Sequence, residues 1–208
     1  MAISTYSELQ TAVANWLDRD DLTDRIPEFI ALAEARMNRV LRLRLMEGKY
    51  TASTVNGQRN YALPTGYIQM RNFQVNTTPI TPVQYVSPEI YDRLYGSTQT
   101  GTPKFYTIVA NEIQLGPIPG SVMTLEMLFY KKITSLSTTN PTEAMLTDNP
   151  DIYLYGALLE AEPFIMNDER VPLWMQGFQQ AVEDLQEQDN KDRHSGSALR
   201  VMNTGGYY

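Results

Sequence analysis

The stretch GKYTASTVNGQRNYALP, residues 48–64, decides the fold because the periodicity of the sequence changes there. Before it, apolar residues recur at helical spacing, whereas from Gly48 onward apolar and polar residues alternate as in a half-buried strand. Asn56-Gly57 between two alternating runs is a strong signal for a two-residue hairpin, because both turn positions need a positive φ. We therefore predict a β-rich segment that begins at Gly48 and opens with this hairpin.

Two helices are predicted before this segment. Thr5 and Glu8 have the spacing of a capping box, and Pro27 suits the first turn of a second helix after the polar turn at 18–24. The apolar stripe of the first helix consists of Tyr6, Leu9, Val13, Trp16 and Leu17. That of the second consists of Ile26, Ile30, Ala33, Met37, Val40 and Leu41.

The β-rich segment continues beyond the hairpin as strands separated by Asn, Gly and Pro. The predicted strands are YIQMRNFQV (67–75), PKFYTIVA (103–110), EIQLGPIP (112–119) and VMTLEMLFYKK (122–132). A short helical turn, SPEIYDRLYG (87–96), interrupts them.

Helical periodicity returns after a polar linker. Asn149 and Pro150 begin a third helix that is apolar on nearly all sides, which predicts burial among other helices or against a neighbouring subunit. Pro163 is expected to kink or end it. A fourth helix follows Asp168, with a stripe of Val171, Trp174, Phe178, Val182 and Leu185.

The predicted fold class is α+β. Two N-terminal and two C-terminal helices form a helical bundle domain from residues 1–47 and 148–192. An antiparallel β domain, 48–133, is inserted into it. A linker spans 134–147 and an extended C-terminal arm spans 193–208.

Composition excludes several functional classes. The chain has no cysteine and one histidine, His194, so disulfides, thiol nucleophiles and imidazole metal sites are not expected, nor is any cofactor. The net charge of -7 argues against a general nucleic-acid binder. The sequence shows neither a long apolar run nor a signal peptide, so we expect no membrane segment and synthesis in the cytoplasm.

Three stretches carry a resemblance to a known family: IPEFIALAEARMNRVLR (26–42), FYTIVANEIQLGPIP (105–119) and DNPDIYLYGALLEAEPFIMNDERVPLWMQGFQQAVEDL (148–185). Their order resembles the head-to-tail adaptor, or connector, proteins of tailed bacteriophages, in particular the podovirus tail-tube-A type. The resemblance implies a virion protein, made in the host cytoplasm, that assembles as a dodecameric ring. Such a ring binds the portal protein, joins it to a tail or nozzle protein, and lets genomic DNA pass without specific binding.

Two groups of residues are candidates for subunit contacts. Tyr153 and Tyr155 lie on the third helix, whose apolar surface exceeds what a four-helix bundle covers, and are predicted to meet a neighbouring subunit. Four arginines crowd the end of the second helix and are candidate channel or interface charges: Arg36, Arg39, Arg42 and Arg44. Alternatively, they form an ordinary solvated face favoured by the helix dipole.

The arm has no helical or strand period, yet it carries apolar residues. A segment of about 16 residues can span up to ~50 Å. We predict that it docks on the portal, by adding to a strand edge or lying in a groove. The predicted docking residues are Leu199, Arg200, Val201, Met202, Tyr207 and Tyr208. A frayed terminus without a partner is the alternative.

Two other functions remain open from the residues. Glu160 and Glu162 lie in an apolar helix, where a carboxylate could act as the general acid of a muralytic, glycan-cleaving enzyme. A DNA-binding module would explain only the four arginines. Because neither reading accounts for the rest of the chain, no enzymatic activity is expected.

Overall fold

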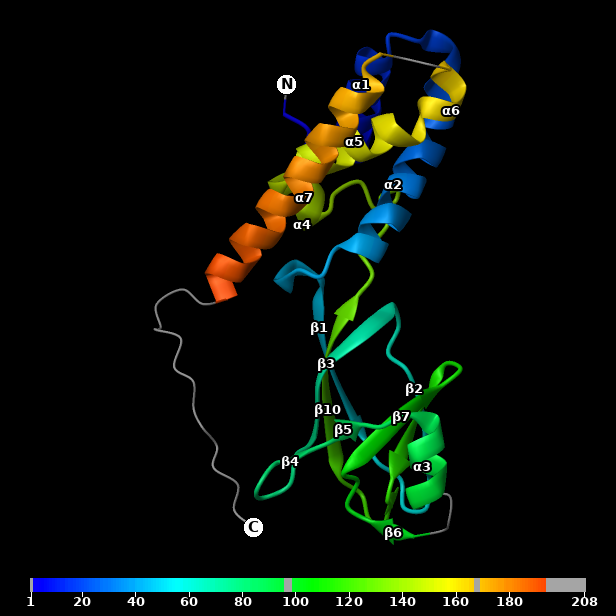
Figure 1. The fold of residues 1–208 in the computed structure, drawn as a ribbon, viewed down its shortest axis with the longest axis vertical. Coiled ribbons are helices and arrows are strands. Elements are labelled where there is room, and N and C mark those ends of the chain that lie inside the picture. The colour runs from blue at the N-terminus through cyan, green and yellow to red at the C-terminus, as the bar shows by residue number, and fades with distance from the viewer. Residues whose placement is uncertain (1, 96–98, 167–168, 194–208) are drawn as a thin grey trace. The chain divides into compact units, whose positions relative to one another are not determined.

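The computed structural model describes residues 2–95, 99–166 and 169–193 (Figure 1). The chain divides into two compact units. A helical unit contains the chain up to Leu45 and from Ile133 onward, and a β unit contains Met46–Lys132. Within the described ranges the chain forms seven α-helices and ten strands, so the predicted α+β class is confirmed.

The first two helices of the helical unit begin as the sequence predicts. α1 (Tyr6–Leu17) starts with a complete capping box, in which Thr5 accepts from the Glu8 N–H and Glu8 accepts from the Thr5 N–H. α2 (Ile26–Val40) has Pro27 in its first turn. The intervening segment, predicted as a turn, forms a 3₁₀ helix, η1 (Asp20–Arg25).

The C-terminal half of the helical unit is built around a buried helix. α5 (Pro150–Glu160) packs against α1, α2 and α7 (Val171–Arg193). It ends at Glu160, and Pro163 lies in the first turn of the separate short helix α6 (Glu162–Ile165), as expected for a residue that cannot continue a helix. The polar linker contains one helix that we did not predict, α4 (Ala144–Asp148), whose Met145 and Leu146 are buried.

One glycine sets the closeness of the helices around α5. A Cβ built on Gly156 would lie 3.1 Å from the Ala33 side chain of α2 and 3.3 Å from the Phe178 ring of α7. A methyl group at this position would be tighter than an ordinary van der Waals contact, so Ala33 or Phe178 would have to shift by a few tenths of an ångström. Gly156 therefore allows α2 and α7 to pack closely on α5.

The β unit consists mainly of two four-stranded sheets, and Figure 1 labels most of their strands. The first has the order β1 (Glu47–Ser53), β10 (Thr124–Lys131), β3 (Tyr67–Val75) and β4 (Thr81–Pro82). The second has the order β2 (Asn60–Ala62), β8 (Glu112–Gly116), β7 (Phe105–Val109) and β5 (Gln84–Tyr85). The short strands β6 (Thr100–Gly101) and β9 (Ile118–Pro119) form a separate pair.

Both four-stranded sheets contribute to one apolar core. Phe73 of β3 and Tyr106 of β7 meet edge to face, with ring centroids 5.1 Å apart. Beside this core, α3 (Pro88–Tyr95) buries Tyr91, whose hydroxyl donates to the Leu115 carbonyl at 2.8 Å. All pairings within the two sheets are antiparallel except that of β5 with β7, which is parallel.

The predicted hairpin at Asn56-Gly57 is wrong, although the turn itself forms. Gly57 has a φ of 79° and the Gln58 N–H donates to the Val55 carbonyl, as a tight turn requires. However, β1 pairs with β10 and β2 pairs with β8, so the two flanking strands belong to different sheets. Asn56 also lacks the positive φ that we predicted for both turn positions, and long-range pairing decides which strands meet.

Candidate interaction surface

The two tyrosines of α5 have different environments. Tyr153 is fully buried inside the helical unit and leaves no side-chain surface for a neighbouring subunit, so burial removes it from the predicted interface. Tyr155 is half buried: its ring meets Trp16 of α1 edge-on, with centroids 5.9 Å apart, and lies against Gly177 of α7. The sequence prediction failed for Tyr153 because α1, α2 and α7 together cover α5 on most sides.

Arg36 is held inside the helical unit rather than presented to a channel. Its guanidinium contacts the Glu160 carboxylate of α5, with the shorter N–O distance at 2.6 Å, and lies 6.0 Å from the Phe178 ring centroid. The Glu160 side chain is 18 % exposed and that of Arg36 is 33 % exposed, so the pair is partly shielded from water. The pairing also gives Glu160 a structural partner in place of the second acid that a glycosidase would require.

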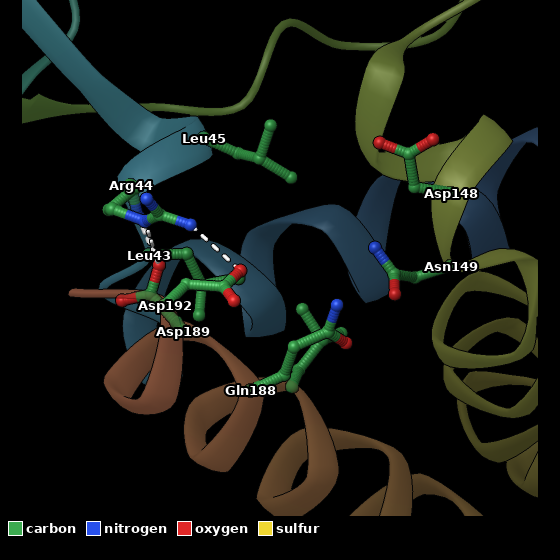
Figure 2. Close-up of a pocket in the computed structure, with 9 residues that line it drawn as sticks. Leu43, Arg44, Leu45, Asp148, Asn149, Gln188, Asp189 and Asp192 are labelled. Atoms are coloured by element: carbon green, nitrogen blue, oxygen red, sulfur yellow. Dashed lines mark hydrogen bonds and ion pairs between the residues drawn. The ribbon is translucent and has the colours of Figure 1, made fainter. Parts of the chain in front are cut away.

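Arg44 belongs to a pocket at the C-terminal end of α7 (Figure 2). Its Nη2 lies 2.8 Å from the Asp192 carboxylate, and its Nε lies 3.3 Å from that of Asp189. The pocket has a volume of about 590 Å³ and combines apolar walls with polar groups. Its lining residues are Leu43, Arg44, Leu45, Asp148, Asn149, Leu185, Gln188, Asp189 and Asp192.

Asp189 is the most strongly held carboxylate of this pocket. Partial burial opposes its ionisation, but hydrogen bonds from the Arg44 backbone N–H at 2.9 Å and from Arg193 at 2.6 Å outweigh burial and lower the pKa of Asp189. The carboxylate is therefore ionised at neutral pH and links α7 to the segment that follows α2. This arrangement stabilises the helical unit, and the lowered pKa makes Asp189 a weaker base than an ordinary carboxylate.

The remaining two arginines of the predicted set differ from each other. Arg42 donates to the backbone carbonyls of Asn38 and Leu41, where it caps the end of α2. Arg39 is exposed and forms no ion pair or hydrogen bond with any residue that the structure describes. Of the four candidate charges, Arg39 is thus the one whose charge is not already used within the described part of the chain.

One buried carboxylate was missed by the sequence analysis. Glu34 is 4 % exposed, and its Oε1 accepts from the Leu136 N–H at 2.8 Å. This hydrogen bond joins α2 to the segment that follows the β unit. Burial raises the pKa of Glu34 above its usual value, against the opposing effect of its hydrogen bonds. Its spacing from Ile30 and Met37 places it on the apolar stripe, and this spacing was the signal that could have identified it.

Other candidate chemistry is sparse in the described ranges. Glu162 is exposed at the start of α6. The described residues contain no group of three or more His, Cys, Asp or Glu side chains that could hold a metal ion. No helix in the same ranges is long and apolar enough to cross a membrane. His194 and the predicted docking residues from Leu199 to Tyr208 lie outside the described residues.

Comparison with protein families gives a match over nearly the whole chain. The family model described as SU10 adaptor protein matches residues 4–202, which includes both units and all the elements above. A search of curated proteins found no match to the chain.

Proposed function

Because the chain belongs to the SU10 adaptor protein family of bacteriophage head-to-tail adaptors, we propose that it forms a ring between the portal and the tail of the virion. The family match across residues 4–202 carries this proposal, since it includes both the helical and the β unit. The family is one of structural proteins, and an adaptor role accounts for the whole chain.

In this proposal the ring is dodecameric and one face of it binds the portal protein. The other face meets a tail or nozzle protein, and genomic DNA leaves the head through the central channel without specific binding. The C-terminal arm, with Leu199, Arg200, Val201, Met202, Tyr207 and Tyr208, docks on the portal. Many arms acting together bind more tightly than one arm, because each bound arm raises the effective concentration of the others.

The two alternative functions have no structural observation in their favour. The muralytic function required a carboxylate with a free partner acid, and Glu160 instead forms an ion pair with Arg36. The DNA-binding function required a basic patch, and three of its four arginines bind groups within the helical unit: Arg36, Arg42 and Arg44. The adaptor function needs neither feature.

Electron microscopy of the purified protein with and without the portal of its phage tests the proposal. We expect rings of twelve subunits on portal particles. A protein that leaves portals bare at micromolar concentration would contradict the portal-binding role. Release of soluble fragments from purified cell walls would instead support the muralytic alternative.

A further inference from the structure

The outer face of α2 exposes apolar side chains to solvent. Leu32 is 51 % exposed, and two small residues, Ala31 and Ala35, are exposed beside it. Arg39 lies on the same face, seven residues after Leu32. Small residues allow another helix to approach closely, and an apolar centre with a charged residue at its edge fits the layout of a protein–protein contact, in which charges lie at the rim.

The outer face of α7 has a complementary pattern. Leu173, near its start, is 64 % exposed. Gln176 and Glu183 follow on the side opposite the buried stripe that contains Trp174 and Phe178. Glu183 is exposed and forms no ion pair or hydrogen bond within the ranges that the structure describes. Along α7, the exposed apolar side chain of Leu173 therefore comes first, and the carboxylate of Glu183, which has no described partner, follows about three turns later.

The spacings on the two faces agree when the helices run parallel. Leu32 and Arg39 are seven residues apart, as are Gln176 and Glu183, so each pair spans about 10 Å along its helix. With Arg39 opposite Glu183, Leu32 lies beside Leu173 and Gln176. In an antiparallel arrangement with the same ion pair, Leu32 would instead face the polar end of α7 near Asn190.

The arrangement of the helices suits such a contact between copies. α2 and α7 both pack on α5 and turn their outer faces away from it, so the two faces are separate surfaces of one unit. In Figure 1 both helices run from the top of the view downward. A rotation about an axis along this direction keeps α2 of one copy parallel to α7 of the next, and repeated contacts of this head-to-tail kind close into a ring.

We infer that the α2 face, made of Ala31, Leu32, Ala35 and Arg39, binds the α7 face of a second copy, made of Leu173, Gln176 and Glu183. The inference rests on the proposed ring and specifies which surfaces build it. Arg39 pairs with Glu183 of the neighbouring copy, while Leu32 packs against its Leu173. No part of this contact uses the buried residue Tyr153.

Charge reversal tests the pairing. Arg39→Glu and Glu183→Arg each place like charges in contact, and each is expected to raise the concentration needed for ring assembly on portals by about tenfold or more. The double variant restores the pair in reverse and should recover most of that loss. Arg93→Glu on α3 makes the same charge change outside both helices and should assemble normally.

Disulfide trapping tests the geometry independently, since the natural chain has no cysteine. Leu32→Cys and Gln176→Cys are made in separate chains and mixed in equal amounts on portals under mild oxidation. We expect a reducible dimer that contains one copy of each variant, with far less dimer from either variant alone. All five substituted positions are exposed, and thermal unfolding checks that each variant folds.

The outcomes separate this inference from the proposed function. Rings that form normally in both charge-reversed variants, without the mixed disulfide, would overturn the α2–α7 contact and leave the adaptor role standing. A natural chain that forms no ring on portals would overturn both. Loss of assembly in the single variants without recovery in the double variant would also count against the direct Arg39–Glu183 pair.

Discussion

Nη2 of Arg36 lies 2.6 Å from Oε1 of Glu160, which joins α2 to α5 across 124 residues of sequence. Because both side chains are partly buried, Glu160→Gln leaves Arg36 in a partly shielded site without its counter-charge. The free energy of unfolding should fall by about 1.5 kcal/mol, measured by chemical denaturation.

An exposed ion pair at the N-terminal end of α2 is the control for this variant. Arg25 and Glu28 lie 3.2 Å apart, and both side chains are more than half exposed. Glu28→Gln should therefore change stability by less than about 0.5 kcal/mol. Equal effects of the two variants would show that burial adds nothing to the Arg36–Glu160 pair.

Tyr153 carries a buried hydroxyl without a hydrogen-bond partner among the described residues. A buried polar group without a partner has lost its bonds to water, so Tyr153→Phe should raise the stability of the helical unit by about 1 kcal/mol. Tyr91→Phe is the opposite case, because the Tyr91 hydroxyl donates to Leu115; it should destabilise the β unit by about the same amount. A loss of stability in Tyr153→Phe would mean that this hydroxyl has a partner.

Glu34 should make stability depend on pH in the direction opposite to a salt-bridged acid. Its pKa in the folded chain is raised above the usual value of 4.5, mainly by burial, so the folded state retains this proton to a higher pH than the unfolded state. The stabilising contribution is complete below the unfolded pKa and is lost as the pH rises through the folded pKa.

Glu34→Gln removes this titration while keeping an oxygen that can accept from the Leu136 N–H. We therefore expect the stability of the variant, relative to the natural chain, to increase between pH 4 and pH 7. Thermal unfolding at several pH values measures this difference. A constant difference across the range would contradict the role of Glu34 ionisation.

Removal of the C-terminal arm after Arg193 should abolish stable portal binding without lowering the stability of the chain. A chain that ends after Arg193 keeps the ion pair of Arg193 with Asp189, at 2.6 Å, and should unfold at the same temperature as the full chain while failing to bind portal stably. A chain that ends after Asp192 loses that pair as well and should unfold at a lower temperature. Normal portal binding by both truncated chains would identify the arm as a frayed terminus.

Local patterns in the sequence predicted much of the fold. The Thr5–Glu8 capping box, Pro27 in the first turn of α2 and the end of α5 before Pro163 are all confirmed. Each depends on residues within one helical turn, so local chemistry determines it. Burial of α5 was also predictable, because its apolar residues lie on nearly all sides.

Features that depend on distant partners were not predictable in this way. The turn at Asn56-Gly57 forms, but β1 and β2 find partners 50 or more residues away, in β10 and β8. Likewise, the charge of Arg44 suggested a surface role, whereas Asp189 and Asp192 bind it from the far end of the chain. Arg44 and Arg39 look alike in the sequence, and only the tertiary contacts of Arg44 show that its charge is already paired.

The first and last strands of the β unit pair with each other, and Glu47 lies opposite Tyr130 where the chain enters and leaves. Paired strands hold these two ends about 5 Å apart, so both connections to the helical unit leave the β unit from neighbouring positions. The entropy of closing such an insert changes only slowly with its length. A different β unit whose first and last strands pair in the same way could therefore replace this one while the helical sequence stays unaltered.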